Sequence, residues 1–345
     1  MIRLLANARY DFLGLRRWSS LVAAAFIIPG LALLLTRGLN YSIEFTGGTL
    51  IQLDSVQGAD AGRLREVLTQ AGIHGADIQP FGSKQGYQIR ARLSAEQEVT
   101  EAEAQRTAAA VQQALDARLG PGTYTVMRTE AVGPKVGREL QSKALIAVLV
   151  SFVATLIYLA ARFEWRFGTA AVLATAHDIL ATLAFMSYLN LEVGLVVVAA
   201  MLTVIGYSLN DTIVIFDRVR ENLRKYRRQN LFEILNLSIN ETLPRTILTG
   251  GTTIATALVL SFFAGPVIRP FALVMSFGII TGTLSSMFIA SPVLLWIEQR
   301  WPGQDVRGAR VLAAPGARST APAAPAAPTP PPGPPREPSK PQAAR

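Results

Sequence analysis

VGLVVVAAMLTVIGYSLNDTIVIF, residues 193–216, is an apolar run long enough to cross a membrane as one helix. Asp211 interrupts this run four apolar residues before the charged string DRVREN begins. A charged side chain inside a span costs about 2.5 to 3.5 kcal/mol on insertion scales, so it usually faces the interior of a helix bundle and serves ion movement. The alternative is a carboxylate at headgroup level, because Asp211 lies only about 9 Å along a helix axis before Asp217.

The rest of the composition also indicates a membrane protein. Half of the residues are hydrophobic and 17% are charged. Five further apolar runs approach the ~20 residues that a spanning helix needs. They are residues 18–36, 144–161, 168–189, 246–265 and 270–296. The sequence therefore predicts an α-helical membrane protein with six transmembrane helices.

The runs divide the chain into segments. We expect an amino end at residues 1–17, a first transmembrane helix at 18–36, an external α+β domain at 37–142 and a five-helix transmembrane bundle at 143–298. Within the bundle, residues 217–245 are expected to be a basic cytoplasmic loop, either plain or containing a helix on the membrane surface. Residues 299–345 are rich in Pro and Ala and predict a disordered cytoplasmic tail.

The net charge of +9 is placed beside the spans. Basic residues concentrate in the amino end and in the 217–245 segment, which six spans put on the same side of the membrane. The positive-inside rule makes that side cytoplasmic, so both termini are expected there, and a nucleic-acid partner is not indicated. The chain has no cysteine, which excludes disulfides and thiolate metal sites.

The external domain shows the order β-α-β-β-α-β. Alternating or strand-like stretches are TLIQLD, ADIQPF, YQIRARL and YTVMRTEAV. Helical spacing covers residues 60–71, and a longer helix follows a capping box at Ser94 and Gln97 and ends at Gly120. This order predicts a ferredoxin-like sandwich of two helices on an antiparallel sheet.

The fourth span has one polar face. Thr203, Tyr207 and Asp211 step by four residues, and Ser208 lies on the same side, so the first two and Ser208 are candidate supports for the carboxylate. Arg245, at the start of the fifth span, is the candidate partner of Asp211 because the two spans run antiparallel. The alternative is an arginine that extends to the headgroups.

A second carboxylate, Asp178, lies near the middle of the third span beside His177. It is a candidate for proton handling, and the alternative is a simple hydrogen bond to a neighbouring helix. Two intramembrane aspartates also raise an aspartyl hydrolase, but neither is flanked by the glycine that such proteases usually show. With no phosphate-binding loop either, the sequence predicts no enzyme, no catalytic residue and no metal site.

Several motifs together resemble one family. They are GYSLNDTIVIFDRVREN at residues 206–222, YSIEFTGGT at 41–49, VGPKVG at 132–137, PRTILTGGTT at 244–253 and FALVMSFGIITGTLSSMFIASPVLL at 271–295. The chain thereby resembles the SecF family, membrane subunits of the bacterial SecDF protein-translocation accessory complex, which is related to resistance-nodulation-division transporters. The resemblance extends from about residue 41 to residue 295 and leaves out the tail.

The resemblance implies a multi-pass protein of the bacterial inner membrane whose partners are SecD, the SecYEG channel, SecA indirectly, the translocating preprotein and membrane lipid. It implies a proton as coupling ion, with Asp211 and Arg245 in its path, and no cofactor; the residues themselves do not distinguish a proton from sodium. Two rivals stay open. One is the half-unit of a standalone proton-coupled exporter, and the other is a structural subunit in which Asp211 and Arg245 only hold helices together.

Overall fold

The computed structural model describes residues 9–301, apart from residues 55, 57, 59, 74–75, 84, 92–100 and 266, and describes residues 101–105 by their backbone alone. All described residues belong to one compact unit, Met1–Val311. The predicted disordered tail lies outside the described residues from position 302 onward, and so does the predicted capping box at Ser94 and Gln97.

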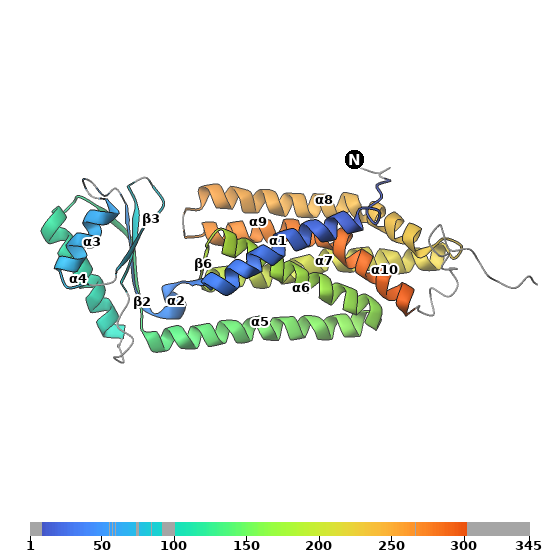
Figure 1. Ribbon diagram of the computed structural model, residues 1–345, viewed down its shortest axis with the longest axis horizontal. Helices are drawn as coiled ribbons and strands as arrows, with labels where there is room; N and C mark the ends of the chain where they lie inside the picture. The colour runs from blue at the N-terminus through green and yellow to red at the C-terminus, as the bar shows by residue number, and fades with distance from the viewer. Residues whose placement is uncertain are drawn as a thin grey trace, which may run out of the picture. The chain divides into compact units, whose positions relative to one another are not determined.

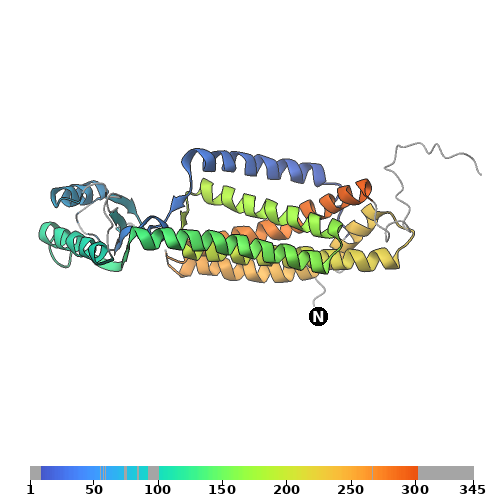
Figure 2. The ribbon, with the colours of Figure 1, turned by 90° about the horizontal axis from the view of Figure 1, so that it is seen from below.

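Six helical segments have the length and apolar composition of membrane spans, as predicted. They are α1 Arg16–Arg37, α5 Pro134–Arg162, α6 Trp165–Tyr188, α7 Leu195–Lys225, α8 Leu231–Phe263 and a last span made of α9 Arg269–Ser285, the π-helical turn η1 Ser286–Ala290 and α10 Ser291–Arg300. Figure 2 shows α1 beside α6. The helix α9 contacts α6, α7 and α8, so it is the element around which the candidate site is built.

Residues 217–245 are mostly helical and not the plain loop that is one of the two predictions for them. The helix α7 continues to Lys225 and α8 begins at Leu231, which leaves a turn of residues 226–230. The apolar side chains expected on a membrane surface are instead buried in the bundle core, and they are Leu231, Ile234, Leu235 and Ile239. Burial of this apolar face between helices removes it from water, which favours extended helices over a plain loop. Asn230 caps α8 by accepting a hydrogen bond from the Glu233 amide at 2.8 Å.

The α/β domain has the predicted order. Its elements are β2 Gly48–Asp54, α3 Ala61–Gln70, β3 Asp77–Pro80, β4 Tyr87–Ala91, α4 Glu101–Leu119 and β5 Thr125–Val132. The strands pair antiparallel in the order β3-β4-β2-β5, which is the ferredoxin-like arrangement. Figure 1 shows α3 and α4 on one face of this sheet. The domain ends earlier than the predicted residue 142, because Pro134 already begins α5, where its missing amide hydrogen leaves no helical bond unmade.

The core of the domain lies between the helices and one sheet face. Strand residues Ile51, Leu53 and Ile89 pack there with helix residues Leu64 and Val111, and all five are buried. The opposite face is unusual because it carries the polar side chains Gln52, Gln88 and Arg90, which are also buried. Buried polar groups need partners. Those partners come from the segments that join the domain to the spans.

Candidate intramembrane carboxylate site

Close packing of α7 against α9 positions the candidate site. A β-carbon placed on Gly282 would lie 2.8 Å from the β-carbon of Ser208, and one on Gly278 would lie 2.4 Å from a methyl carbon of Val204. Both distances are shorter than van der Waals contact, so only glycine allows this approach. The two helices are therefore near enough for short side chains to form hydrogen bonds between them.

Asp178 has three polar side chains within hydrogen-bond distance of its carboxylate. Its side chain on α6 is buried, and its Oδ2 accepts hydrogen bonds from Ser208 of α7 at 2.5 Å and from Ser285 of α9 at 2.7 Å. Nδ1 of His177 lies 3.0 Å from its Oδ1. Asp178 thus ties three spans together, and a fully bonded buried carboxylate favours the structural alternative weighed for it from the sequence.

Asp211 lies one turn after Ser208 and is 3% exposed. Thr283 of α9 donates a hydrogen bond to its Oδ2 at 3.2 Å. Next to it, the hydroxyl oxygens of Thr212 and Ser286 are 2.8 Å apart. Burial inside the bundle agrees with the interior position expected from the sequence. Unlike Asp178, Asp211 has a single side-chain donor among the described residues, which leaves its second oxygen open.

Arg245 forms no ion pair with Asp211 among the residues that the structure describes, although the two lie near enough for their charges to interact. Arg245 is exposed on α8, whereas the next residue, Thr246, is 1% exposed. One residue rotates a helix position by about 100°, so the helix turns Thr246 inward and Arg245 outward.

The other predicted supports are placed differently. The Tyr207 hydroxyl lies 3.2 Å from that of Thr253 on α8, and Thr203 donates to the backbone of its own helix at 2.8 Å. Neither touches the carboxylate, but Ser208 bonds Asp178 directly. The hydrogen bonds from the hydroxyls of Thr283 and Ser285 to the two carboxylates are not predicted from the sequence. Their only signal is the run TGTLSS within the last span, which small-residue helix packing explains equally well.

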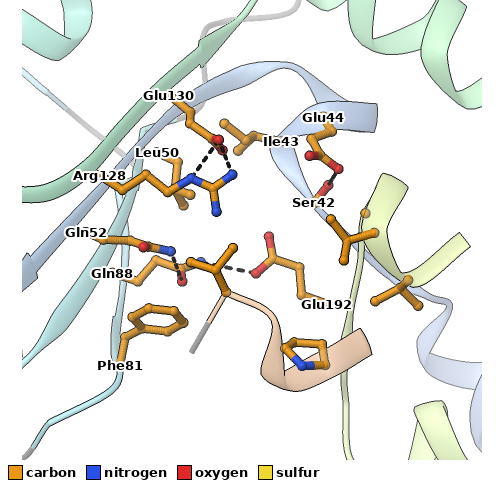
Figure 3. A pocket seen from close by; sticks show the side chains of 15 residues that line it. Ser42, Ile43, Glu44, Leu50, Gln52, Phe81, Gln88, Arg128, Glu130 and Glu192 are labelled. Carbon is orange, nitrogen blue, oxygen red and sulfur yellow. Dashed lines mark hydrogen bonds and ion pairs between the residues drawn. The ribbon is translucent and has the colours of Figure 1, made fainter. Parts of the chain in front are cut away.

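A second polar cluster joins the α/β domain to α7, and Figure 3 shows three of its members, Glu44, Gln88 and Glu192. Glu192, in the short strand β6 Glu192–Val193 before α7, forms an ion pair with Arg90 of β4 at 2.5 Å and accepts from Gln88 at 3.2 Å. The Glu44 carboxylate accepts from the Leu195 amide at 2.6 Å and so satisfies a free donor at the start of α7. The helix that carries Asp211 is therefore bonded at its amino end to the domain.

Two glycines bring the first span's exit against α5. Gly47 has φ +74°, and a β-carbon on it would lie 2.8 Å from the α-carbon of Pro134. One turn into α5, a β-carbon on Gly137 would lie 3.0 Å from the Gly47 amide nitrogen. Gly47 thus needs its lack of a side chain for both conformation and space. The pair Gly47 and Gly48 leads directly into strand β2.

Comparison with known proteins agrees with this architecture. Residues 111–300 match the family described as "Protein export membrane protein SecD/SecF, C-terminal", and residues 32–59 match the "SecD/SecF GG Motif". Protein translocase subunit SecF of Gemmatimonas aurantiaca is 51% identical over 323 residues, which covers 93% of this chain and 97% of that protein. The SecF of Rickettsia akari is 42% identical and covers 76% of this chain and 83% of that protein.

A solved structure supports the same assignment. The crystal structure of SecDF, a translocon-associated membrane protein from Thermus thermophilus, superposes with a TM-score of 0.75 at 34% identity. The match covers 86% of this chain and 40% of the SecDF chain, so this chain spans less than half the length of that protein. The same family is indicated by the six spans, the ferredoxin-like domain, the two-glycine motif and relatives that match over most of their length. The chain belongs to the SecF family of multi-pass protein-export membrane proteins.

Proposed function

We propose that the protein is the SecF subunit of a SecDF complex in a bacterial inner membrane, with both termini in the cytoplasm. It pairs with SecD beside the SecYEG channel, and after SecA has driven a preprotein partly across, it uses the proton motive force to complete translocation. The chain acts by binding and movement and not by covalent catalysis. The observation that carries the proposal is the buried Asp211 carboxylate, which among the described residues has one side-chain hydrogen-bond donor and, nearby, an arginine that forms no ion pair.

In this proposal Asp211 takes up and releases the coupling proton at its carboxylate. The ionised form accepts from Thr283 and interacts with the charge of Arg245, whereas the protonated form loses that charge interaction. Moving one charge across ~100 mV supplies about 2.3 kcal/mol, enough to bias two arrangements of α7 and α9 that differ by a few kcal/mol. Four buried side-chain atoms have no hydrogen-bond partner in the described residues, and two of them, Nε2 of His177 and Oγ1 of Thr246, belong to spanning helices and mark places where a water could bind.

The α/β domain would receive this movement through the start of α7. Glu44 bonds the Leu195 amide, and Glu192 bonds Arg90 of the sheet, so α7 and the domain share direct contacts. A shift of α7 along its axis must stretch or break these bonds. The domain would then grip or release the emerging polypeptide in step with the protonation of Asp211.

Asp211→Asn tests the proposal, because asparagine keeps the shape and the hydrogen bond to Thr283 but cannot ionise. Preprotein completion is measured in energised membrane vesicles, and co-purification of SecD reports assembly. Lost proton-dependent completion with an intact complex supports the proposal, whereas a lost complex supports the structural rival. The matched control is Glu233→Gln, an exposed carboxylate at the start of α8. Retained proton-dependent completion in Asp211→Asn removes Asp211 from this role.

A further inference from the structure

A surface cavity of about 580 Å³ lies between the ends of two spans, where α5 and α7 finish, outside the carboxylate site. Four of its lining side chains are cations and two are carboxylates. They are Arg162, Asp217, Arg220, Glu221, Arg224 and Lys225. Four positive charges against two negative charges leave the cavity with an excess of two positive charges. Such an excess attracts an anion.

Exposed tryptophans place this end of the spans at the membrane surface. Trp165 begins α6 three residues after Arg162 and is 56% exposed. Its ring lies 6.1 Å from that of Trp301, which lies 6.0 Å from that of Trp296. Exposed tryptophans at helix ends are typical of the headgroup region on either side of a bilayer. Arg162 is therefore expected at headgroup depth.

The wall of the cavity is preorganised. Asp217 pairs with Arg162 at 2.6 Å and lies 3.7 Å from a guanidinium nitrogen of Arg220. Both guanidinium groups also lie over the Phe163 ring, at 5.3 and 5.7 Å from its centre. Two planar cations are thus held on one buried aromatic ring. Less side-chain entropy is lost when such fixed groups bind a ligand.

The remaining cations lack an acidic partner. Over the residues that the structure describes, Arg224 and Lys225 form no ion pair, and the Lys225 ammonium lies 5.0 Å from the centre of the Tyr226 ring. One to three turns before Arg162, α5 also exposes the apolar side chains of Val153 and Ile157. Cations at headgroup depth above an exposed apolar helix face fit a molecule with an anionic head and acyl chains.

We propose that this cavity binds the phosphate headgroup of an anionic phospholipid, with Arg220 and Arg224 contacting the phosphate and the acyl chains lying along α5. Guanidinium groups match phosphate oxygens in geometry as well as in charge. The exposed apolar surface of α5 favours a lipid over free phosphate as the source of the anion. This site is separate from the proton site, and its test does not depend on transport activity.

Binding is measured by native mass spectrometry of the full-length protein in detergent, titrated with phosphatidylglycerol, phosphatidylcholine or inorganic phosphate. The double variant Arg220→Gln and Arg224→Gln should bind phosphatidylglycerol about thirtyfold more weakly, since each cation near a membrane surface contributes about 1 kcal/mol. The matched control is Arg227→Gln with Arg228→Gln. These arginines are exposed, follow α7 directly and do not line the cavity, yet their loss changes the net charge equally.

Selective loss in the cavity variant, with phosphatidylcholine binding weakly throughout, supports the proposal. An equal loss of phosphatidylglycerol binding in both double variants shows general attraction to a basic surface and overturns the proposal. Displacement of phosphatidylglycerol by inorganic phosphate at equal concentration identifies free phosphate as the ligand and overturns the lipid source. Thermal unfolding of each variant in the same detergent verifies the fold, and all four arginines are outside the buried core.

Discussion

Ser208 on α7 donates a 2.5 Å hydrogen bond to Asp178 on α6, and it lies one turn before Asp211 on its own helix. On the facing helix α9, Ser285 bonds Asp178 and Thr283 bonds Asp211. Both carboxylates are therefore held by the same two helices. Because Asp178 bonds both α7 and α9, a movement that separates Asp211 from Thr283 must also strain one of the two serine bonds to Asp178, so Asp178 opposes that movement.

The first prediction concerns the serines on Asp178. Ser208→Ala or Ser285→Ala should each lower the free energy of unfolding by about 1–3 kcal/mol, because a buried carboxylate loses a donor. The double variant should lose more stability than the sum of the two single losses, since the Asp178 carboxylate would keep only His177 as a polar neighbour. Thermal unfolding in detergent measures this. The control is Ser276→Ala, a buried serine that bonds only the backbone of its own helix, and an equal loss there would contradict the prediction.

A second prediction uses two glycines with opposite surroundings. Gly282→Ala would place a β-carbon 2.8 Å from Ser208, so α7 and α9 must separate, at a cost of about 1–3 kcal/mol. Gly206→Ala meets open space on the same helix pair and should be neutral or stabilising by up to about 1 kcal/mol. Unfolding in a denaturing detergent series distinguishes the two. If both variants unfold alike, close packing of these helices does not hold the site.

The sequence predicts those features that depend on pattern and composition. Six apolar runs predict six spans, and the order of strands and helices predicts the ferredoxin-like domain; the structure has both. The cost of burying a charge in lipid predicts that Asp211 lies inside the bundle, where it is buried. The rotation of each helix about its own axis is harder to predict from the sequence. Arg245 and Thr246 are adjacent, and the packing of α8 against α9 and α7 decides which of them faces inward.

The roles of hydroxyl donors and the positions of helix ends are also hard to predict from the sequence. Thr283 and Ser285 are common residues of packed spans, and only the three-dimensional approach of α9 to the carboxylates gives them a role. The basic segment after residue 217 favours a loop by composition. Its apolar positions can equally be buried between extended helices, and the buried Leu231 and Ile234 show that they are.

The third prediction tests the bond between the domain and α7. Glu192→Gln removes the acid that faces Arg90, whose side chain is 9% exposed, and so leaves a guanidinium charge uncompensated. Because Glu192 is 25% exposed, solvent should limit the loss of stability to about 1–3 kcal/mol. Hydrogen exchange should increase in β4 and at the start of α7.

A paired variant provides the control for that prediction. Arg90→Met combined with Glu192→Met removes both charges, so it should recover much of the lost stability, since uncharged side chains of similar length carry no desolvation cost. Proton-dependent translocation should stay low in the double variant if the bond transmits movement. Full activity in the double variant would show that the ion pair serves only packing.

The last prediction isolates the close approach of Gly47 to α5. Gly38 and Gly47 have nearly equal φ angles of +73° and +74°, but Gly38 has open space around its α-carbon, whereas a β-carbon on Gly47 would lie 2.8 Å from Pro134. Gly38→Ala therefore measures backbone strain alone, about 1–3 kcal/mol, because φ +73° with ψ −176° is a conformation that almost only glycine adopts. Gly47→Ala should cost about 1–3 kcal/mol more, because α5 must move away from the first span's exit. Equal thermal stability of the two variants would mean that conformation alone, and not the packing of this turn on α5, explains the glycine.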